Sequence, residues 1–148
     1  MSQHTVTLSW ARNEAPFGYK EYPREHQVDF GHGHTLACTA APEYLGKADI
    51  PDPEQAYVAA LSSCHMLTFL AFCSLQGLTL ESYRDEAVGF LEKGENGKPV
   101  LARIELHPQT TFGEGVEVSP EKLAELHHKA HAECFLANSV KTEITTVL

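Results

Sequence analysis

Residues 52–77 read DPEQAYVAALSSCHMLTFLAFCSLQG and predict a long helix that runs to Gln76 and stops at Gly77. Asp52 is a favoured N-cap residue, and Pro53 suits the first helical position. Gln55 is placed to bond back to the cap. A glycine after the last turn is a common helix end.

The composition of this helix is unusual, because no Asp, Glu, Lys or Arg occurs from Gln55 to Leu80. Apolar side chains surround the helix, as they do in a membrane-spanning segment. Several of its polar side chains would nevertheless be costly in lipid: Ser62, Ser63, His65, Thr68, Ser74 and Gln76. We therefore expect no membrane association, and instead a central helix in a globular core that a partner subunit can share.

The other segments predict strands and one more helix, which makes the expected fold class α+β. Asn96-Gly97 is a strong hairpin signal, and Gly31-His32-Gly33 predicts a bulge or hairpin bend. Ser119-Pro120 predicts the start of the second helix by the same cap and proline pattern. Alternation and β-branched content predict strands at residues 6–10, 26–38, 82–92, 100–107 and 140–148.

The length and the 43% hydrophobic content of residues 1–148 fit one cored domain. The chain has 20 acidic and 11 basic residues, a formal charge of −9, which argues against nucleic acid and anionic membranes as partners. The opening residues MSQHTVTLSWAR lack a signal-peptide pattern, so we expect a cytoplasmic location. In that reducing compartment, four cysteines indicate metal binding, redox catalysis or packing.

Cys64 is the cysteine in the middle of the predicted helix, far beyond the first turn, where the helix dipole acts. The dipole therefore cannot acidify its thiol, and a reactive Cys64 needs a cation from elsewhere. His65 is turned about 100° away around the helix and is poorly placed for this. Arg24 and Arg12 are the best available cations, because arginine keeps its charge when buried. Without such a cation, Cys64 is a small packed hydrophobe.

The other cysteines have different expected roles. Cys73 lies about 180° around the helix from Cys64, so these two cannot form a disulfide. We expect Cys73 and Cys38 to pack in the core. Cys134 shares one helical face with His127 and His131, at i, i+4 and i+7, which leaves a zinc site open as an alternative. Three histidines at alternating positions of the predicted strand region, which would share one face of it, could extend that ligand set: His26, His32 and His34.

Two segments resemble the OsmC/Ohr family of osmotically inducible and organic hydroperoxide resistance proteins: PEQAYVAALSSCH at 53–65, and HAEC at 131–134 followed by Asn138-Ser139. The resemblance implies a thiol peroxidase without haem or metal, which uses a hydroperoxide substrate and a cellular dithiol reductant. It also implies an OsmC-like fold, in which antiparallel sheets wrap around long central helices in an intertwined homodimer.

The same resemblance assigns roles to individual residues. Cys64 matches the peroxidatic cysteine, which becomes a sulfenic acid, and Cys134 matches the resolving cysteine, which forms the disulfide with it. Glu54 matches a glutamate that orients an arginine over the thiolate. Arg24 is the candidate for that arginine, and Arg12 is the alternative.

One departure from the family pattern concerns the segment CFLA at 134–137, which lacks the Cys-Pro of the organic hydroperoxide branch. The chain is therefore closer to the broader OsmC-like branch, and no preference between organic and hydrogen peroxide is predicted. The alternative function is a metal- or small-ligand-binding stress module on the face of His127, His131 and Cys134.

Overall fold

The computed structural model describes all 148 residues, which form two compact units, residues 1–56 and residues 57–148. The helix α1 (Pro53–Leu75) begins at the end of the first unit and continues through the second. The expectation of one domain over residues 1–148 stays a prediction.

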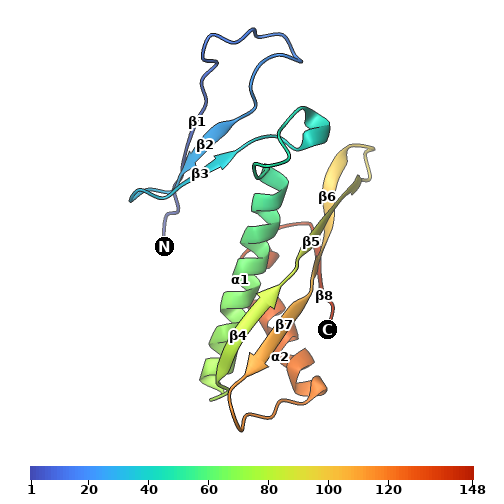
Figure 1. Ribbon diagram of the computed structural model, residues 1–148. Helices are drawn as coiled ribbons and strands as arrows, with labels where there is room; N and C mark the ends of the chain where they lie inside the picture. Colours follow the sequence, from blue (N-terminus) through green and yellow to red (C-terminus); the bar gives the residue numbers. More distant parts are fainter. The chain divides into compact units, whose positions relative to one another are not determined.

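The first unit is built on a three-stranded antiparallel sheet in the order β1-β2-β3 (Figure 1). At the β2–β3 turn, Gly31, His32 and Gly33 all have positive φ, so the predicted bend is a hairpin connection. A short 3₁₀ helix, η1 (Pro42–Tyr44), follows the sheet. The three strands are β1 (Thr7–Ser9), β2 (His26–Asp29) and β3 (Thr35–Cys38).

The start and the end of α1 confirm the predicted helix signals. The Gln55 N–H donates to Asp52 Oδ1 at 2.8 Å, and the Asp52 N–H donates to Gln55 Oε1 at 3.1 Å. This reciprocal pair is a capping box, which satisfies two backbone donors at the helix start. Gly77, with φ of +69°, takes the left-handed conformation that commonly follows a helix end.

The second unit combines two helices with two small sheets (Figure 1). One sheet is the antiparallel pair β4–β7, and the other has the order β5-β6-β8. The helix α2 (Pro120–Glu133) begins at the predicted cap, where Ser119 Oγ accepts from the Lys122 N–H at 3.1 Å. The strands are β4 (Leu80–Asp85), β5 (Val88–Lys93), β6 (Pro99–Leu106), β7 (Pro108–Phe112) and β8 (Glu143–Thr146), and the 3₁₀ helix η2 spans Ala137–Ser139.

Three features of the strands differ from the sequence prediction. The expected strand at 82–92 is two strands, β4 and β5, because the chain changes sheets between Asp85 and Val88. β7 was not predicted, since only His107 separates it from β6 and no turn signal marks the break. β8 pairs with β6 in parallel, although the other pairs are antiparallel. The mixed α+β class with antiparallel sheets is confirmed.

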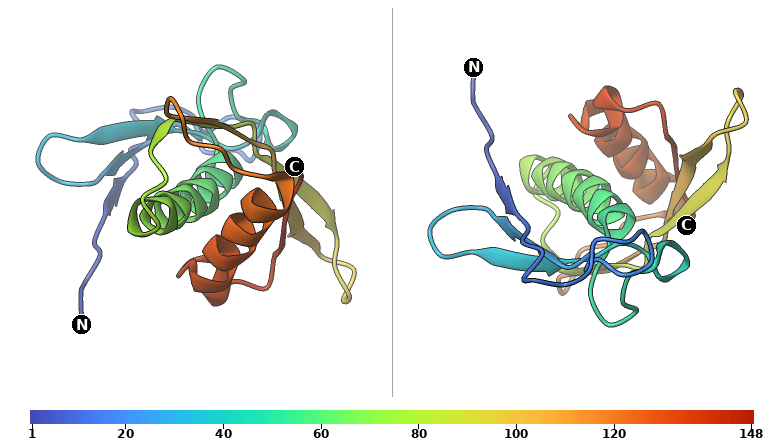
Figure 2. Two further views of the ribbon diagram at one scale, coloured as in Figure 1. Left: turned by 90° about the horizontal axis from the view of Figure 1, so that it is seen from below. Right: turned by 90° about the horizontal axis from the view of Figure 1, so that it is seen from above.

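The two helices lie side by side on the same side of the strands in the second unit (Figure 2). They share a buried cluster in which Phe69 and Cys73 of α1 pack with Leu126 and Ala130 of α2. A second cluster joins Leu61 of α1 to the β5-β6-β8 sheet through Ile104 and Leu106. These clusters hold α1 against α2 on one side and against the β5-β6-β8 sheet on another.

Candidate active site

The thiols of Cys64 and Cys134 meet in the second unit. The two Sγ atoms are 2.7 Å apart, and the Cys134 S–H donates to Cys64 Sγ. Both cysteines are free thiols, and a disulfide bond would bring the sulfurs to about 2.05 Å. The two sulfurs therefore lie close to bonding geometry.

Local structure places each sulfur of this pair. Cys64 lies in the middle of α1, and Cys134 is the C-cap residue of α2, so the two sulfurs come from adjacent helices. The backbone turns at Cys134, with ψ of 116°, and its carbonyl accepts from the Asn138 N–H at 3.1 Å. Cys134 is thus held by the end of α2 and by the η2 turn.

The environments of the two thiols differ. Cys134 is buried, and this burial raises the pKa of its thiol; the hydrogen bond to Cys64 raises that pKa further. Cys64 is only half-buried and accepts the S–H of its neighbour. Cys64 is therefore the better placed of the two to meet a substrate.

The turn of α1 that carries Cys64 is anchored by Asp85, which the sequence did not identify. Ser62 Oγ donates to Asp85 Oδ2 at 2.5 Å, and the His107 N–H donates to Asp85 Oδ1 at 2.7 Å. This carboxylate, at the end of β4, links α1 to the junction of β6 and β7. No local pattern signals such a link, because Ser62 and Asp85 are 23 residues apart.

The face formed by His127, His131 and Cys134 does not form a metal site. His127 is buried and turned to His65, Cys134 faces Cys64, and His131 is exposed. No group of three or more His, Cys, Asp or Glu side chains could hold a metal ion. The alternative metal site is therefore wrong for this chain, because His127 and Cys134 are turned to other partners and His131 is exposed.

The histidines of the first unit are equally separate from that face. His26 lines a pocket of the first unit, and His32 and His34 are exposed around the β2–β3 turn. They do not extend a ligand set, so the second part of the zinc interpretation also fails.

The predicted cation, Arg24, lies half-buried in the first unit. Its guanidinium donates to the carbonyl oxygens of Tyr22, at 2.5 Å, and Tyr19, and it sits 3.6 Å from the centroid of the Tyr22 ring. Glu54 is half-buried in the first turn of α1 and forms no ion pair with Arg24. Arg12 is exposed and donates to the Ala15 carbonyl at 2.5 Å.

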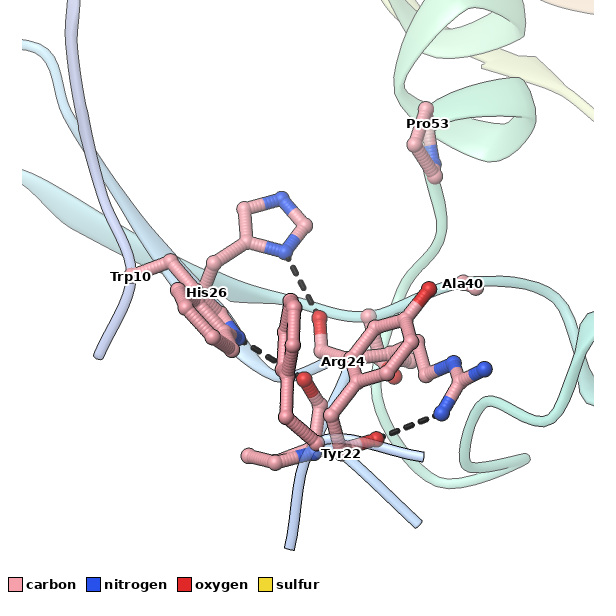
Figure 3. A pocket seen from close by; sticks show the side chains of 9 residues that line it. Trp10, Tyr22, Arg24, His26, Ala40 and Pro53 are labelled. Carbon is pink, nitrogen blue, oxygen red and sulfur yellow. Dashed lines mark hydrogen bonds between the residues drawn. The ribbon is translucent and has the colours of Figure 1, made fainter. Parts of the chain in front are cut away.

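Arg24 also lines a pocket of about 450 Å³ in the first unit (Figure 3). The Trp10 Nε1–H donates to the Pro23 carbonyl at 2.7 Å, which holds the indole in the pocket wall. The lining combines apolar and aromatic surface with one guanidinium and one imidazole. It consists of Trp10, Phe17, Tyr22, Pro23, Arg24, His26, Thr39, Ala40 and Pro53.

Charge pairing separates the four arginines into two groups. Arg84 pairs with Glu86, and Arg103 pairs with Glu92 and Glu105, so both arginines of the second unit have carboxylate partners. Arg12 and Arg24, in the first unit, hydrogen-bond only to backbone carbonyls. These two therefore keep a positive charge that no carboxylate neutralises.

The remaining cysteines are packing residues. Cys38 is buried at the end of β3, and Cys73 is buried in the α1–α2 cluster. Burial also raises the pKa of the Cys73 thiol, which keeps it unreactive. The expectation that both pack in the core is confirmed.

Similar proteins identify the family. The family model described as OsmC-like protein matches residues 46–148. An OsmC-like protein of unknown function from Vibrio cholerae is 39% identical, with 99% of each chain covered and a TM-score of 0.94. No curated protein sequence matches the chain.

More distant structures share the fold. The organic hydroperoxide resistance protein OhrB of Bacillus subtilis is 18% identical, with 96% of each chain covered and a TM-score of 0.66. An organic hydroperoxide resistance protein from Legionella pneumophila is 19% identical, with 99% of this chain and 97% of that chain covered and a TM-score of 0.68. With the family model over residues 46–148 and the Vibrio cholerae relative over nearly the full length, the chain belongs to the OsmC-like protein family.

Proposed function

We propose that this protein is a cysteine-based thiol peroxidase that reduces hydroperoxides. The observation that carries the proposal is the contact between two free thiols, Cys64 Sγ and Cys134 Sγ, at 2.7 Å. A pair at this distance needs almost no movement to close a disulfide. Membership of a family that includes organic hydroperoxide resistance proteins supports a peroxide as the oxidant.

The proposed reaction has three steps. The Cys64 thiolate attacks the O–O bond of ROOH, so an S–O bond forms, the O–O bond breaks, and ROH leaves after taking up a proton. The Cys134 thiol then attacks the Cys64 sulfenic acid, which forms the disulfide and releases water. A cellular dithiol reduces the disulfide, supplying two electrons and two protons. Cys64 takes the first step because it is the less buried sulfur and accepts the S–H.

The first step also needs a positive charge near the thiolate, since the middle of α1 gives no dipole assistance. We assign this role to Arg24, with Glu54 as the residue that orients it. Arg24 is one of two arginines without a carboxylate partner, and unlike Arg12 it is half-buried beside a pocket with apolar walls. Such a cation would stabilise both the thiolate and the leaving oxygen.

We further propose that the protein works as a homodimer in the cytoplasm. α1 is long and apolar enough to cross a membrane, by length and composition alone. Only 22% of its most apolar stretch is buried inside the chain, so most of this apolar surface is left uncovered. Leu67, for example, is 60% exposed on a helix with no charged side chain after Glu54. A second copy of the chain would cover this apolar face. Leu67→Glu should give a monomer by analytical ultracentrifugation, whereas Leu148→Glu, at an equally exposed residue, should not.

Peroxide consumption tests the proposed reaction. The reduced protein should consume one equivalent of tert-butyl hydroperoxide or hydrogen peroxide and lose two thiols. Peptide mass mapping should then find a Cys64–Cys134 disulfide. Cys64→Ser should abolish the consumption, whereas the double variant Cys38→Ala, Cys73→Ala should retain it. Consumption by Cys64→Ser at the parent rate would refute the proposal.

A further inference from the structure

A buried pair of histidines lies beside the thiols and has no part in the reaction described so far. His65 Nε2 and His127 Nδ1 are 3.0 Å apart, and both residues are only 2% exposed. Their ring planes differ by 3°, with centroids 5.3 Å apart. With 3.0 Å between the facing nitrogens, this places the rings edge to edge, in the geometry of a linear N–H···N bond.

The surroundings bury the pair and keep it uncharged. The Phe69 ring stacks on His127 at 4.2 Å between centroids, and Tyr83 closes the cluster beside it. Burial lowers the pKa of His65 to about 4, and burial lowers that of His127 to about 4 as well. Near neutral pH both imidazoles are therefore uncharged, and one ring can donate an N–H to the lone pair of the other.

The hydrogen bond between His65 and His127 joins the two helices that carry the thiols. Apart from the contact of the two thiols themselves, it is the only hydrogen bond between a side chain of α1 and a side chain of α2. His65 directly follows Cys64, and His127 lies about two helical turns before Cys134 on the same face of α2. Apolar contacts between helices tolerate small rotations and slides, whereas a linear hydrogen bond has one favoured geometry.

We propose that the hydrogen bond between His65 and His127 is the positioning element that holds the Cys134 thiol against the Cys64 sulfur. The proposal rests on the proposed function and adds to it the residues that control the second step. In that step the Cys134 S–H and the Cys64 S–OH give the disulfide and water. The bond should accelerate this closure and stabilise the disulfide, and it should leave the first attack on peroxide unchanged.

Two pairs of variants test this positioning role. His127→Phe and His65→Leu remove the bond and keep the sites apolar and filled. His127→Asn and His65→Gln are the rescue variants, because the Asn amide reproduces the position of Nδ1 and the Gln amide that of Nε2. Cys73→Ala is the matched control, since it disturbs the same α1–α2 cluster without touching the bond.

The decisive measurement is the thiol–disulfide equilibrium of Cys64 and Cys134 in a dithiothreitol redox buffer, followed by mass spectrometry. It needs no peroxide, so it stands even if the peroxidase proposal fails. One buried hydrogen bond is worth about tenfold in such an equilibrium. His127→Phe and His65→Leu should therefore raise the midpoint potential by about 30 mV, the equivalent of tenfold for two electrons. The rescue variants and Cys73→Ala should stay near the parent value.

A kinetic measurement separates the two steps. After mixing with one equivalent of peroxide, the bond-breaking variants should lose the first thiol at the parent rate and should close the disulfide about tenfold more slowly. The inference is overturned if the bond-breaking variants keep the parent potential, or if His127→Asn shifts it as far as His127→Phe does. It is also overturned if both bond-breaking variants fail to fold, because the pair would then maintain the fold and not the thiol approach.

Discussion

The two compact units divide the requirements of the proposed reaction between them. Residues 57–148 bring the two sulfurs to 2.7 Å, but both arginines of that unit are paired with carboxylates. Residues 1–56 contain a single, buried cysteine and hold the two arginines without carboxylate partners. Disulfide closure therefore belongs to the second unit, and the proposed activation of the attacking sulfur assigns its charge to an arginine of the first.

The largest expected effect is confined to the second unit. Cys134→Ser should abolish disulfide formation completely, since no other cysteine lies against Cys64. The first equivalent of peroxide should still be consumed, which leaves a sulfenic acid at Cys64 that dimedone traps. Mass spectrometry of the intact protein distinguishes the two products. A disulfide between Cys64 and Cys73 in this variant would show that α1 rearranges. It would contradict the view that residues 57–148 hold Cys64 ready for Cys134 alone.

The next effect should come from the first unit alone. Arg24→Met should slow the first step by about 100-fold, as removal of one charged stabiliser does in other active sites. The thiol–disulfide equilibrium of Cys64 and Cys134 should stay unchanged, because the sulfurs are held by residues 57–148. Stopped-flow thiol loss measures the first effect, and the dithiothreitol equilibrium measures the second.

Arg12→Met is the control for this charge, because Arg12 is exposed and bonds only to the Ala15 carbonyl. It should change the first step less than twofold, roughly the effect of a screened surface charge. A loss of about 100-fold in Arg12→Met, with Arg24→Met unaffected, would transfer the role to Arg12.

The fold shows which sequence signals were sufficient. Local rules identified both ends of α1, since the capping box and Gly77 act within a few residues. They also identified the β5–β6 hairpin, where Gly97 has a φ of +77°. They missed β7 and the break between β4 and β5, because strand partners are chosen by contacts far along the chain.

Local sequence rules also identified only part of the candidate active site. The segments around Cys64 and Cys134 carried a family pattern, so both thiols were predicted before their contact was seen. His65 had no role that the sequence could assign, because its partner His127 is 62 residues away. Asp85 gave no signal for the same reason. The role of a side chain that depends on one distant partner cannot be predicted from local spacing.

Glu54→Gln tests the smaller of the two effects assigned to the first unit. Glu54 forms no ion pair with Arg24 in this structure, so we expect it to orient the arginine only when the thiolate attacks the peroxide. The first step should slow by about tenfold, within the range for a residue that acts through another. In the double variant with Arg24→Met, Glu54→Gln should add no further loss, because both would remove one interaction. Fully additive losses would mean that Glu54 acts independently.

The smallest expected effect concerns the pH dependence of stability, and it belongs to the second unit. The folded-state pKa values of His65 and His127, both about 4, lie below the unfolded value of 6.5. Between these values the unfolded chain binds more protons, so stability falls as the pH falls from about 6.5 to about 4. The charged and titratable groups facing the pair are His131, which also lowers the pKa of His65, and Asp85, which raises it; Tyr83 packs against His127.

At pH 5.5 each imidazole should cost about 1 kcal/mol of unfolding free energy relative to pH 7. Urea unfolding at the two pH values measures this loss, and His127→Phe should lose about half of it. Because His128 is exposed on the same helix, His128→Phe is the control and should keep the parent dependence. If His128→Phe flattens the pH profile as much as His127→Phe does, the acid sensitivity comes from the surface, and the neutral buried pair does not set it.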